Sequence, residues 1–417
     1  MLHPVAVRRQ GCIKAIAATV VLCLAAVLPT LAMAQVRKPG PPVTATAAMT
    51  YLTRAYPEPL PLSLVEPVIT DKGIKGAEVA LSDNQTTGRL LGHAYTLSTR
   101  IVAADADIAA AMRDVLASGS SLIVADLEAA DLLAVADIPE AKDALIINTR
   151  SSNDDLRGKS CRRNVFHAAP SWAMRADALS QYLTWKQWRK LFVVYGENAA
   201  DQEYVAAIKR AAKRFGNKIV DERKFTFDAG NRRTDTGHQQ IQTQMPLLTQ
   251  GPPEHDLIFV ADLDEAFGEY LMWRTSVAKP VIGTQGLMAL AWHRAFEQYG
   301  GTQLQSRFEK HAKRQMIERD YLGWLGTRLI GEAITRIGQA DAASVRAFLL
   351  SPEFEVAGFK GQGMTFRTWD RQLRQPILLT GPRALVSISP QEGFLHPKFL
   401  TYTLGFDEAE TQCTQRN

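Results

Sequence analysis

Short apolar runs alternate with longer amphipathic runs through most of this chain, and no other feature constrains its fold as strongly. Residues 121–126 (SLIVAD) and 144–149 (ALIINT) are typical of buried strands, and a short helix is predicted between them at 127–136. The same rhythm resumes with a strand at 190–196 (KLFVVYG) and a helix at 199–215. Strands that alternate with helices of this length form βαβ units and parallel sheets. Two such series in 417 residues predict an α/β fold with two doubly wound parallel-sheet lobes.

The pattern continues to about residue 338, after which the chain changes character. Gly88 is expected to stop the first helix, and the polar stretch 228–253 is assigned to no element. Gly/Pro turns between the last apolar runs indicate antiparallel strands, and hence a small C-terminal β segment. Further strands are predicted at 62–67, 94–102, 217–227, 255–262, 280–284, 364–370, 375–380 and 384–389, and further helices at 73–88, 106–118, 171–189 and 302–338.

The N-terminal segment has the pattern of an export signal. Basic residues precede a charge-free apolar run at 15–28, and the small residues Ala32 and Ala34 form a cleavage pattern. The run is shorter than the ~20 residues needed to span a bilayer. We expect residues 1–34 to be a signal peptide cut near Ala34, which leaves a soluble periplasmic protein. The alternative is an uncleaved membrane anchor.

The rest of the chain carries little net charge. The formal charge of +5 falls to +2 without the three basic residues of the predicted signal, which contains no acidic residue. A charge near zero gives no electrostatic reason to expect nucleic acid or an anionic membrane as a partner. The basic run at 209–214 lies on a predicted helix and is interpreted as a solvated face.

Two of the four cysteines lie in the predicted signal, which leaves Cys161 and Cys413. Exported proteins meet an oxidising compartment, so we predict a disulfide between them. The alternative is two free thiols, or thiols that pair with another molecule.

Motifs of common enzymes are absent from the sequence. It has no phosphate-binding Gly-rich loop followed by Lys-Ser/Thr, no CxxC, no HExxH and no GxSxG, and its eight His are scattered. We therefore expect a protein without enzymatic activity and without a cofactor.

Four segments resemble one family of transport proteins. They are 73–88 (GIKGAEVALSDNQTTG), 144–152 (ALIINTRSS), 189–204 (RKLFVVYGENAADQEY) and 279–287 (KPVIGTQGL). In each case the residues are similar to a helix or a strand and loop of type I periplasmic solute-binding proteins, in particular the branched-chain amino acid receptors of ABC transporters. The resemblance extends over nearly all of the chain after the signal.

The resemblance implies a monomer whose two lobes close over a small solute by hinge motion. A membrane permease of the ABC transporter would then recognise the closed form. The implied division is a Pro-rich lead-in at 35–61, a first lobe at 62–169 plus 288–357, and a second lobe at 170–287 plus 358–417. The chain would cross between the lobes near 168–171, 285–289 and 357–363.

Ligands of open parallel sheets bind at the carboxyl ends of the strands, beside helix N-termini. The stretch 149–152 could hold a carboxylate, or it could be a capped turn without a ligand. Tyr195 could equally pack in the core or hinge. The candidate ligand-binding residues are Asp126, Glu128, Thr149, Arg150, Ser151 and Ser152 in the first lobe, and Tyr195, Asn198, Asp262, Thr284 and Gln285 in the second.

Two departures from the amino acid receptors bear on the ligand. Gln285 lies where those receptors tend to carry a Glu that binds the ligand's ammonium group. Asp126 and Glu128 lie where the relatives favour Gly and Ser, and carboxylates there would repel an anionic ligand. We infer that the ligand is not a standard branched-chain amino acid.

Three longer runs resemble a narrower branch, the binding proteins associated with PQQ-dependent alcohol catabolism. They are 291–308, 366–379 and 389–396. The resemblance implies a solute linked to alcohol oxidation.

An alternative function is that of a periplasmic sensor that acts on a membrane receptor.

PQQ dehydrogenases need Ca²⁺ or a lanthanide, which suggests a metal-binding alternative. Asp126, Glu128, Asp154 and Asp155 supply hard oxygen ligands of the type these ions prefer. The simpler interpretation is that these residues are ordinary acids at helix N-termini and on the surface.

Overall fold

The computed structural model describes residues 41–58, 67–226 and 238–415 of the chain. The predicted signal at 1–34, its cleavage near Ala34 and nearly all of the strand predicted at 62–67 lie outside these residues. None of the described helices is long and apolar enough to cross a membrane.

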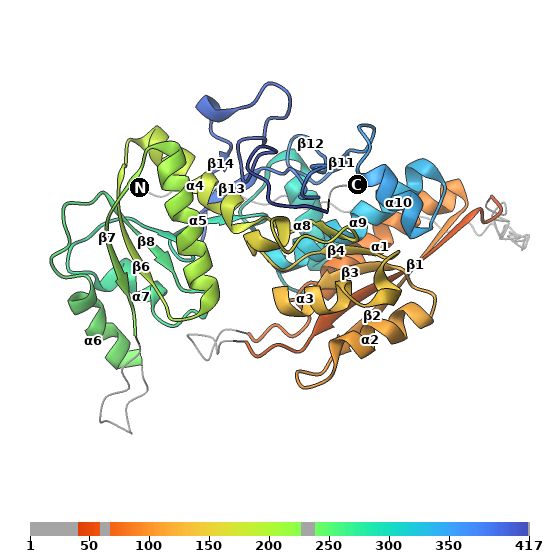
Figure 1. Ribbon diagram of the computed structural model, residues 1–417, viewed down its shortest axis with the longest axis horizontal. Coiled ribbons are helices and arrows are strands. Elements are labelled where there is room, and N and C mark those ends of the chain that lie inside the picture. Colours follow the sequence, from red (N-terminus) through yellow and green to blue (C-terminus); the bar gives the residue numbers. More distant parts are fainter. Residues whose placement is uncertain (1–40, 59–66, 227–237, 416–417) are drawn as a thin grey trace, which may run out of the picture. The chain divides into compact units, whose positions relative to one another are not determined.

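Five strands form the first sheet: β1 (Ala45–Arg54), β2 (His93–Val102), β3 (Leu122–Asp126), β4 (Leu145–Asn148) and β5 (Val165–His167). They are all parallel and lie in the order β2-β1-β3-β4-β5 (Figure 1). Neither β1 nor β5 was predicted from the sequence. β1 falls inside the predicted lead-in at 35–61, yet it pairs with a strand on each side. Its Ala-rich sequence lacks the Val and Ile residues that usually identify a strand.

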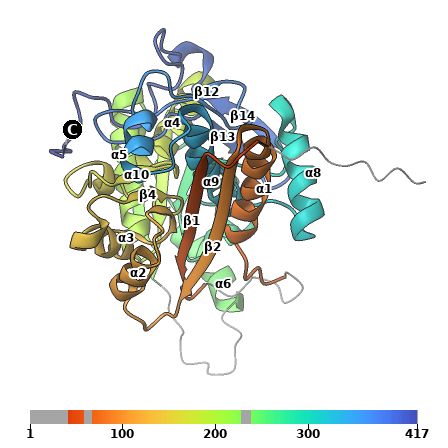
Figure 2. The same ribbon diagram turned by 90° about the vertical axis from the view of Figure 1, so that its right-hand side faces the viewer.

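Helices cover both faces of the first sheet. They are α1 (Ile74–Leu91), α8 (Gly301–Ala312), α9 (Glu318–Ile337) and α10 (Ala342–Leu349) on one face, and α2 (Ile108–Ala117) and α3 (Ala129–Ala136) on the other. Side chains alternate along β3, because successive residues of a strand face opposite sides. Leu122 and Val124 pack beneath α1 and α9, whereas Ile123 and Ala125 pack beneath α2 and α3. Figure 2 shows α1 and α9 side by side against the sheet.

Two of the helix predictions were wrong. α1 does not stop at Gly88 but continues to its left-handed cap at Gly92. Gly88 instead permits close packing, because a Cβ there would lie 2.6 Å from the backbone oxygen of His93. The helix predicted at 302–338 is two helices, α8 and α9.

Seven strands form the second sheet: β6 (Lys190–Tyr195), β7 (Lys218–Lys224), β8 (Leu257–Ala261), β9 (Val281–Gly283), β10 (Leu287–Leu290), β13 (Ile377–Thr380) and β14 (Leu385–Ser389). Their order is β14-β13-β10-β9-β8-β6-β7. The strands from β6 to β10 are parallel, and β13 and β14 add to them antiparallel, so the predicted C-terminal β segment extends this sheet. A separate pair consists of β11 (Val356–Ala357) and β12 (Gly363–Met364). The strand predicted at 364–370 is only the end of β12.

Helices also cover both faces of the second sheet. They are α4 (Trp172–Lys186) and α5 (Ala199–Phe215) on one face, and α6 (His238–Leu248) and α7 (Gly268–Arg274) on the other. α6 lies in the stretch 228–253 that was assigned to no element. Short 3₁₀ turns complete the secondary structure: η1 (Pro139–Ala141), η2 (Asp154–Arg157), η3 (Gln298–Gly300) and η4 (Glu392–Phe394).

The chain passes between the two sheets three times. The first passage, between β5 and α4, lies at the predicted 168–171. The second follows β10 and is later than the predicted 285–289, because β10 pairs with β9 and β13. Residues 288–290 therefore belong to the second lobe, contrary to the predicted division.

The third passage also lies later than predicted. It was expected at 357–363, but Met364, Phe366 and Leu373 still pack in the core of the first lobe. The chain enters the second sheet only with β13. Part of the stretch 358–373 therefore packs with the first lobe, while Arg367 donates to the backbone oxygens of Leu404 and Phe406 near the C-terminus.

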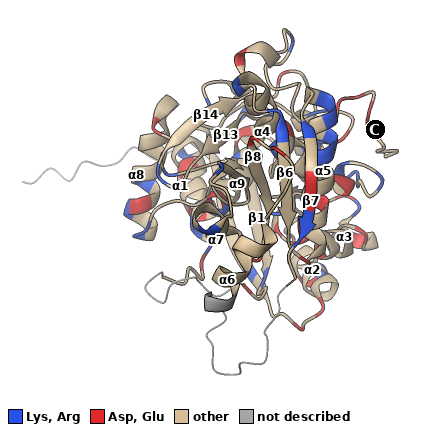
Figure 3. Cartoon of the chain, turned by 90° about the vertical axis from the view of Figure 1, so that its left-hand side faces the viewer, with Lys and Arg blue, Asp and Glu red and all other residues tan. Residues whose placement is uncertain are grey.

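The C-terminal segment contacts both lobes. The predicted disulfide between Cys161 and Cys413 is present, with the two Cα atoms 5.6 Å apart. Just before it, Glu410 forms an ion pair of 2.8 Å with Arg210 of α5, a helix on which Figure 3 shows several basic residues. The run 209–214 is therefore partly engaged in ion pairs and is not simply a solvated face.

Candidate functional site

A cleft of about 730 Å³ lies at the carboxyl ends of strands from both sheets. Parallel strands end at one edge of a sheet, and the following helices begin there, so backbone N–H groups and loop side chains gather at this edge. The cleft is lined in the first lobe by Glu128, Arg150, Ser151, Ser152, Asn153, Glu318 and Arg319, and in the second by Trp172, Arg175, Asn198, Glu203, Tyr204, Asp262, Thr284, Gln285 and Met288, among others.

A larger cavity, of about 930 Å³, lies at the opposite, amino-end edge of β4 and β5. It is lined by the first lobe and the C-terminal segment, with no residue of the second sheet. A solute held by hinge closure must touch both lobes, so the smaller cleft is the candidate solute site.

Most of the predicted site residues line the cleft, but three do not. Asp126 is buried behind the wall, where its carboxylate accepts a hydrogen bond of 3.1 Å from Thr53. The hydroxyl of Thr149 donates to the backbone oxygen of Ala125 at 3.1 Å, and Tyr195 packs against the core of the second lobe. Those that line the cleft are Glu128, Arg150, Ser151, Ser152, Asn198, Asp262, Thr284 and Gln285.

The loop after β4 is a side-chain-capped turn. Oδ1 of Asn148 accepts N–H bonds from Arg150 (3.1 Å) and Ser151 (2.9 Å), and its Nδ2 donates to the backbone oxygen of Ser151 at 2.8 Å. These bonds are local, as Asn side chains often make in turns. The Ser152 hydroxyl, by contrast, makes no hydrogen bond within the described part of the chain. It is the group of this loop that remains able to bind a solute.

The acidic residues after β3 are neutralised by arginines. Asp126 lies 3.4 Å from Arg319 and 3.8 Å from Arg150. Arg150 also pairs with Glu128 at 3.0 Å and stacks over the Tyr56 ring, 4.2 Å from its centroid. The carboxylates of Asp126 and Glu128 are thus paired with the guanidinium groups of Arg150 and Arg319. The inference that these carboxylates repel an anionic ligand was therefore wrong, because it took no account of their partners.

The four acids suggested as metal ligands do not converge. Asp154 accepts an N–H bond of 3.0 Å from Ala173, and Asp155 accepts a bond of 2.7 Å from Ser160. Neither lines the cleft, whereas Glu128 does. Among the described residues, no group of three or more His, Cys, Asp or Glu is placed to hold a metal ion. The metal-binding alternative is not supported.

The second lobe contributes an aromatic wall that was not predicted. Trp172 lines the cleft, packs against the core of the second lobe and stacks on Tyr204, with ring centroids 4.6 Å apart. Arg175, one turn further along α4, donates to the backbone oxygen of Ala289 at 2.6 Å and pairs with Glu318 at 3.1 Å. Its Nε is buried and has no partner among the described residues. These residues could have been found from their place in the sequence, because they begin helix α4, which follows directly after the first passage of the chain between the lobes.

The polar residues after β8 and β9 mainly stabilise one another. The Asp262 carboxylate accepts N–H bonds from Ala266 (3.0 Å), Phe267 (2.8 Å) and Gly268 (2.6 Å). Its backbone N–H donates to the Thr284 hydroxyl, and its backbone oxygen accepts a bond of 3.0 Å from Gln285. These side chains shape the wall of the cleft.

Asp201 lies directly beneath this wall, on α5. Burial raises the pKa of its carboxyl to about 7, against the effect of an N–H bond from Leu263 and with a contribution from the nearby Asp262. The N-cap of α5 is Asn198, whose Oδ1 accepts the N–H of Asp201 at 2.7 Å. The Asn198 side chain thus acts mainly as a helix cap.

Comparisons with known proteins agree with this geometry. The sequence model of the periplasmic binding protein family matches residues 69–244. A search of curated proteins finds no match. The matched family is described as periplasmic binding proteins.

Several solved structures have the same fold. A periplasmic ligand-binding protein of a branched-chain amino acid ABC transporter from Burkholderia xenovorans LB400 is similar with a TM-score of 0.68 and 15% identity, over 88% of this chain and 99% of that one. A solute-binding protein from R. palustris in complex with benzoate has a TM-score of 0.62 and 14% identity, over 88% and 99%. A substrate-binding protein from Desulfitobacterium hafniense in complex with Leu has a TM-score of 0.62 and 15% identity, over 82% and 99%. The predicted α/β fold with two parallel-sheet lobes is confirmed.

Proposed function

We propose that the chain is the solute-binding subunit of an ABC importer and captures a small solute in the cleft between its lobes. The observation that carries the proposal is the position of the cleft, at the carboxyl ends of both sheets and lined by both lobes. The three passages of the chain between the sheets provide the hinge. The protein acts as a periplasmic monomer without a cofactor, and its closed form is recognised by a permease in the inner membrane.

The solute is a small compound with an apolar body and a carboxylate or hydroxyl group. Ser152 supplies a free hydroxyl, and Arg175 supplies a guanidinium whose Nε lacks a partner among the described residues. Trp172 and Met288 supply apolar surface in the same cleft. The two ligand-bound structures of similar fold contain Leu and benzoate, and both of these molecules combine an apolar body with a carboxylate. This likeness supports the proposed class.

Side-chain interactions are among the contacts that link the lobes beside the cleft. Arg175 of α4 pairs with Glu318 of α9 at 3.1 Å, and Asn153 of the loop after β4 donates to Glu203 of α5 at 2.5 Å. Each joins an element of one lobe to an element of the other. Hinge motion in this protein must therefore make and break these bonds.

A thermal-shift screen tests the proposal, because a solute that binds only the folded state stabilises it by about 2.7 kcal/mol at 100 times its Kd. The panel contains leucine, benzoate and short-chain acids, aldehydes and alcohols, and titration calorimetry follows for each compound that raises Tm. Trp172→Ala is expected to weaken binding at least about tenfold, since it removes the aromatic wall. Trp185→Ala is the matched control, because Trp185 lies on the same helix and is 58% exposed.

Two outcomes contradict the proposed site. One is that no compound of the panel changes Tm. The other is that the Trp172→Ala and Trp185→Ala proteins bind a confirmed solute equally well, which would place the solute outside the cleft.

We further propose that the solute is linked to PQQ-dependent alcohol oxidation. This proposal rests on the resemblance of 291–308, 366–379 and 389–396 to the binding proteins of that branch. Compared with its parent, a strain without the gene is expected to grow more slowly on alcohols and equally well on sugars. Equal growth on both, together with binding of amino acids alone, would contradict the link and leave the solute-binding function intact.

A further inference from the structure

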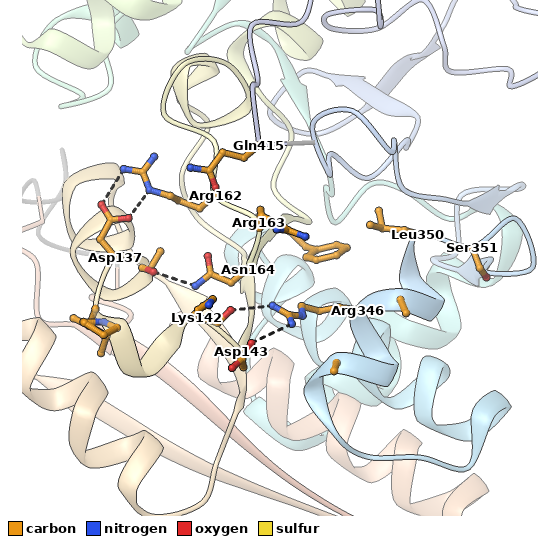
Figure 4. A pocket seen from close by; sticks show the side chains of 16 residues that line it. Asp137, Lys142, Asp143, Arg162, Arg163, Asn164, Arg346, Leu350, Ser351 and Gln415 are labelled. Atoms are coloured by element: carbon orange, nitrogen blue, oxygen red, sulfur yellow. Dashed lines mark hydrogen bonds and ion pairs between the residues drawn. The ribbon is translucent and has the colours of Figure 1, made fainter. Parts of the chain in front are cut away.

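The larger cavity, of about 930 Å³, has its own chemistry (Figure 4). It lies at the amino-end edge of the first sheet, between the segment after α3, the residues that precede β5, and α10. Gln415 of the C-terminal segment closes one side. The cavity is therefore separate from the solute cleft and at the opposite end of the strands.

Basic side chains outnumber acidic ones around this cavity. Lys142, Arg162, Arg163 and Arg346 all line it. Arg162 is neutralised by Asp137, with which it shares two hydrogen bonds. Lys142 and Arg163 have no side-chain hydrogen bond or ion pair within the described ranges. Positive charge without a counter-charge thus faces the cavity.

Asp143 balances this charge only weakly. Its carboxylate lies 4.0 Å from Arg346, at the limit of an ion pair, and its side chain is 89% exposed. An exposed pair at this distance contributes little. Arg346 is instead held by hydrogen bonds to the backbone oxygens of Lys142 (3.1 Å) and Ala144 (3.4 Å).

A buried arginine adjoins the cavity through its bond to Gln415. Arg371 is 1% exposed, and its Nη2 donates to the backbone oxygen of Gln415 at 2.6 Å. Its Nη1 is buried and has no partner among the described residues. Burial lowers the pKa of Arg371, and the positive charges of Arg163 and Arg346 lower it further, whereas Asp370 opposes them. A buried guanidinium with an unmade hydrogen bond and two like charges beside it is unfavourable unless an anion compensates it.

The framework around these charges is fixed without a ligand. The disulfide holds the start of the 161–166 segment against the C-terminal segment. Asn164 donates to the backbone oxygens of Ala136 (3.0 Å) and Ala141 (2.8 Å), which ties the segment after α3 to β5. A site whose donors are held in advance loses little entropy when it binds.

We propose that this cavity binds an oxyanion with at least two negative charges, a phosphate or a polycarboxylate, between Lys142, Arg163 and Arg346. Guanidinium groups bind both classes through paired N–H bonds to two oxygens. The buried Arg371 adds positive potential and orders the adjoining Gln415 backbone. This site is independent of the solute cleft, and it stands whether or not the proposed transport function is correct.

Titration calorimetry with the full chain tests the proposal, with inorganic phosphate and citrate as separate probes in a buffer without other multivalent anions. Arg163→Gln and Lys142→Gln are each expected to weaken binding at least tenfold. Arg163 is exposed, so its replacement leaves the fold intact. Arg383→Gln, at an exposed arginine outside the cavity, is the matched control and is expected to bind as the parent does.

The two probes distinguish the sources of the anion. Binding of phosphate alone identifies a phosphate site, and binding of citrate alone identifies a polycarboxylate site. The proposal is overturned if neither probe binds at millimolar concentration, or if the control variant loses as much affinity as Arg163→Gln.

Discussion

The carboxyl of Asp201 offers a direct test of the electrostatics beneath the cleft. Its Oδ1 accepts the N–H of Leu263 at 2.8 Å, and burial raises its pKa from 3.8 to about 7. The change Asp201→Asn keeps an oxygen that accepts this N–H bond and removes the charge. The variant therefore resembles the protonated form of the wild-type residue at every pH.

The magnitude follows from the pKa difference between the folded and unfolded states. A rise from 3.8 to about 7 corresponds to a maximum of about 4 kcal/mol, at 1.36 kcal/mol per unit. Because the folded pKa is the higher one, the folded state holds the proton more tightly. The stabilisation is complete below about pH 4 and is lost as the pH rises through about 7. Above pH 7 the wild-type protein must keep a buried charge that the variant lacks.

Urea unfolding at pH 4.5, 6 and 8 measures this difference. We expect Asp201→Asn to match the wild type within about 1 kcal/mol at pH 4.5 and to exceed its free energy of unfolding by about 2 to 4 kcal/mol at pH 8. Asp105→Asn, at an exposed loop position before α2, is the control for the same chemical change away from the cleft. If the gap between Asp201→Asn and wild type is the same at all three pH values, the reasoning is refuted.

Three further predictions concern stability. Replacing both disulfide cysteines by serine is expected to lower the free energy of unfolding by about 3 to 5 kcal/mol, because the bridge spans 252 residues; a loss below about 1 kcal/mol in urea unfolding would contradict this. Arg175→Gln and Glu318→Gln are expected to show a coupling of about 1 kcal/mol or more in a double-mutant cycle, and strict additivity would mean that their 3.1 Å ion pair is without effect. Gly331→Ala is expected to destabilise by about 1 to 3 kcal/mol through overpacking, because its Cβ would lie 2.1 Å from the Asn84 side chain. Gly381→Ala has open space and serves as its control, with Tm as the readout.

Elements with clear ends in the sequence were predicted well. The helix predicted at 199–215 is α5 (Ala199–Phe215), since Asn198 caps its start and Gly216 its end. β1 was missed because strand formation there depends on two neighbours that lie far along the chain. A central strand built from small residues becomes recognisable only when its partners are in place.

The candidate site shows the same division between local and distant information. Ser152 follows a predicted strand, so its place at the sheet edge was evident from the sequence. The partner of Asp126 was not, because Arg319 lies 193 residues away along the chain. Trp172 was not among the predicted site residues, although helix α4 begins at the cleft and places this side chain in its wall. The charge of the cleft wall near Asp126 therefore depends on ion pairs between residues far apart in the sequence, which the sequence alone did not reveal.

The way the C-terminal segment is fastened limits the motion proposed for the lobes. Glu410 is fixed to α5 of the second lobe, and Cys413 is bonded to Cys161 of the first. The three residue steps between these anchors reach about 11 Å when fully extended. The segment thus limits how far the two lobes can separate at this edge. A wider separation must first break the ion pair between Glu410 and Arg210. Reduction of the disulfide would remove this restraint and increase the range of the hinge motion between the two lobes.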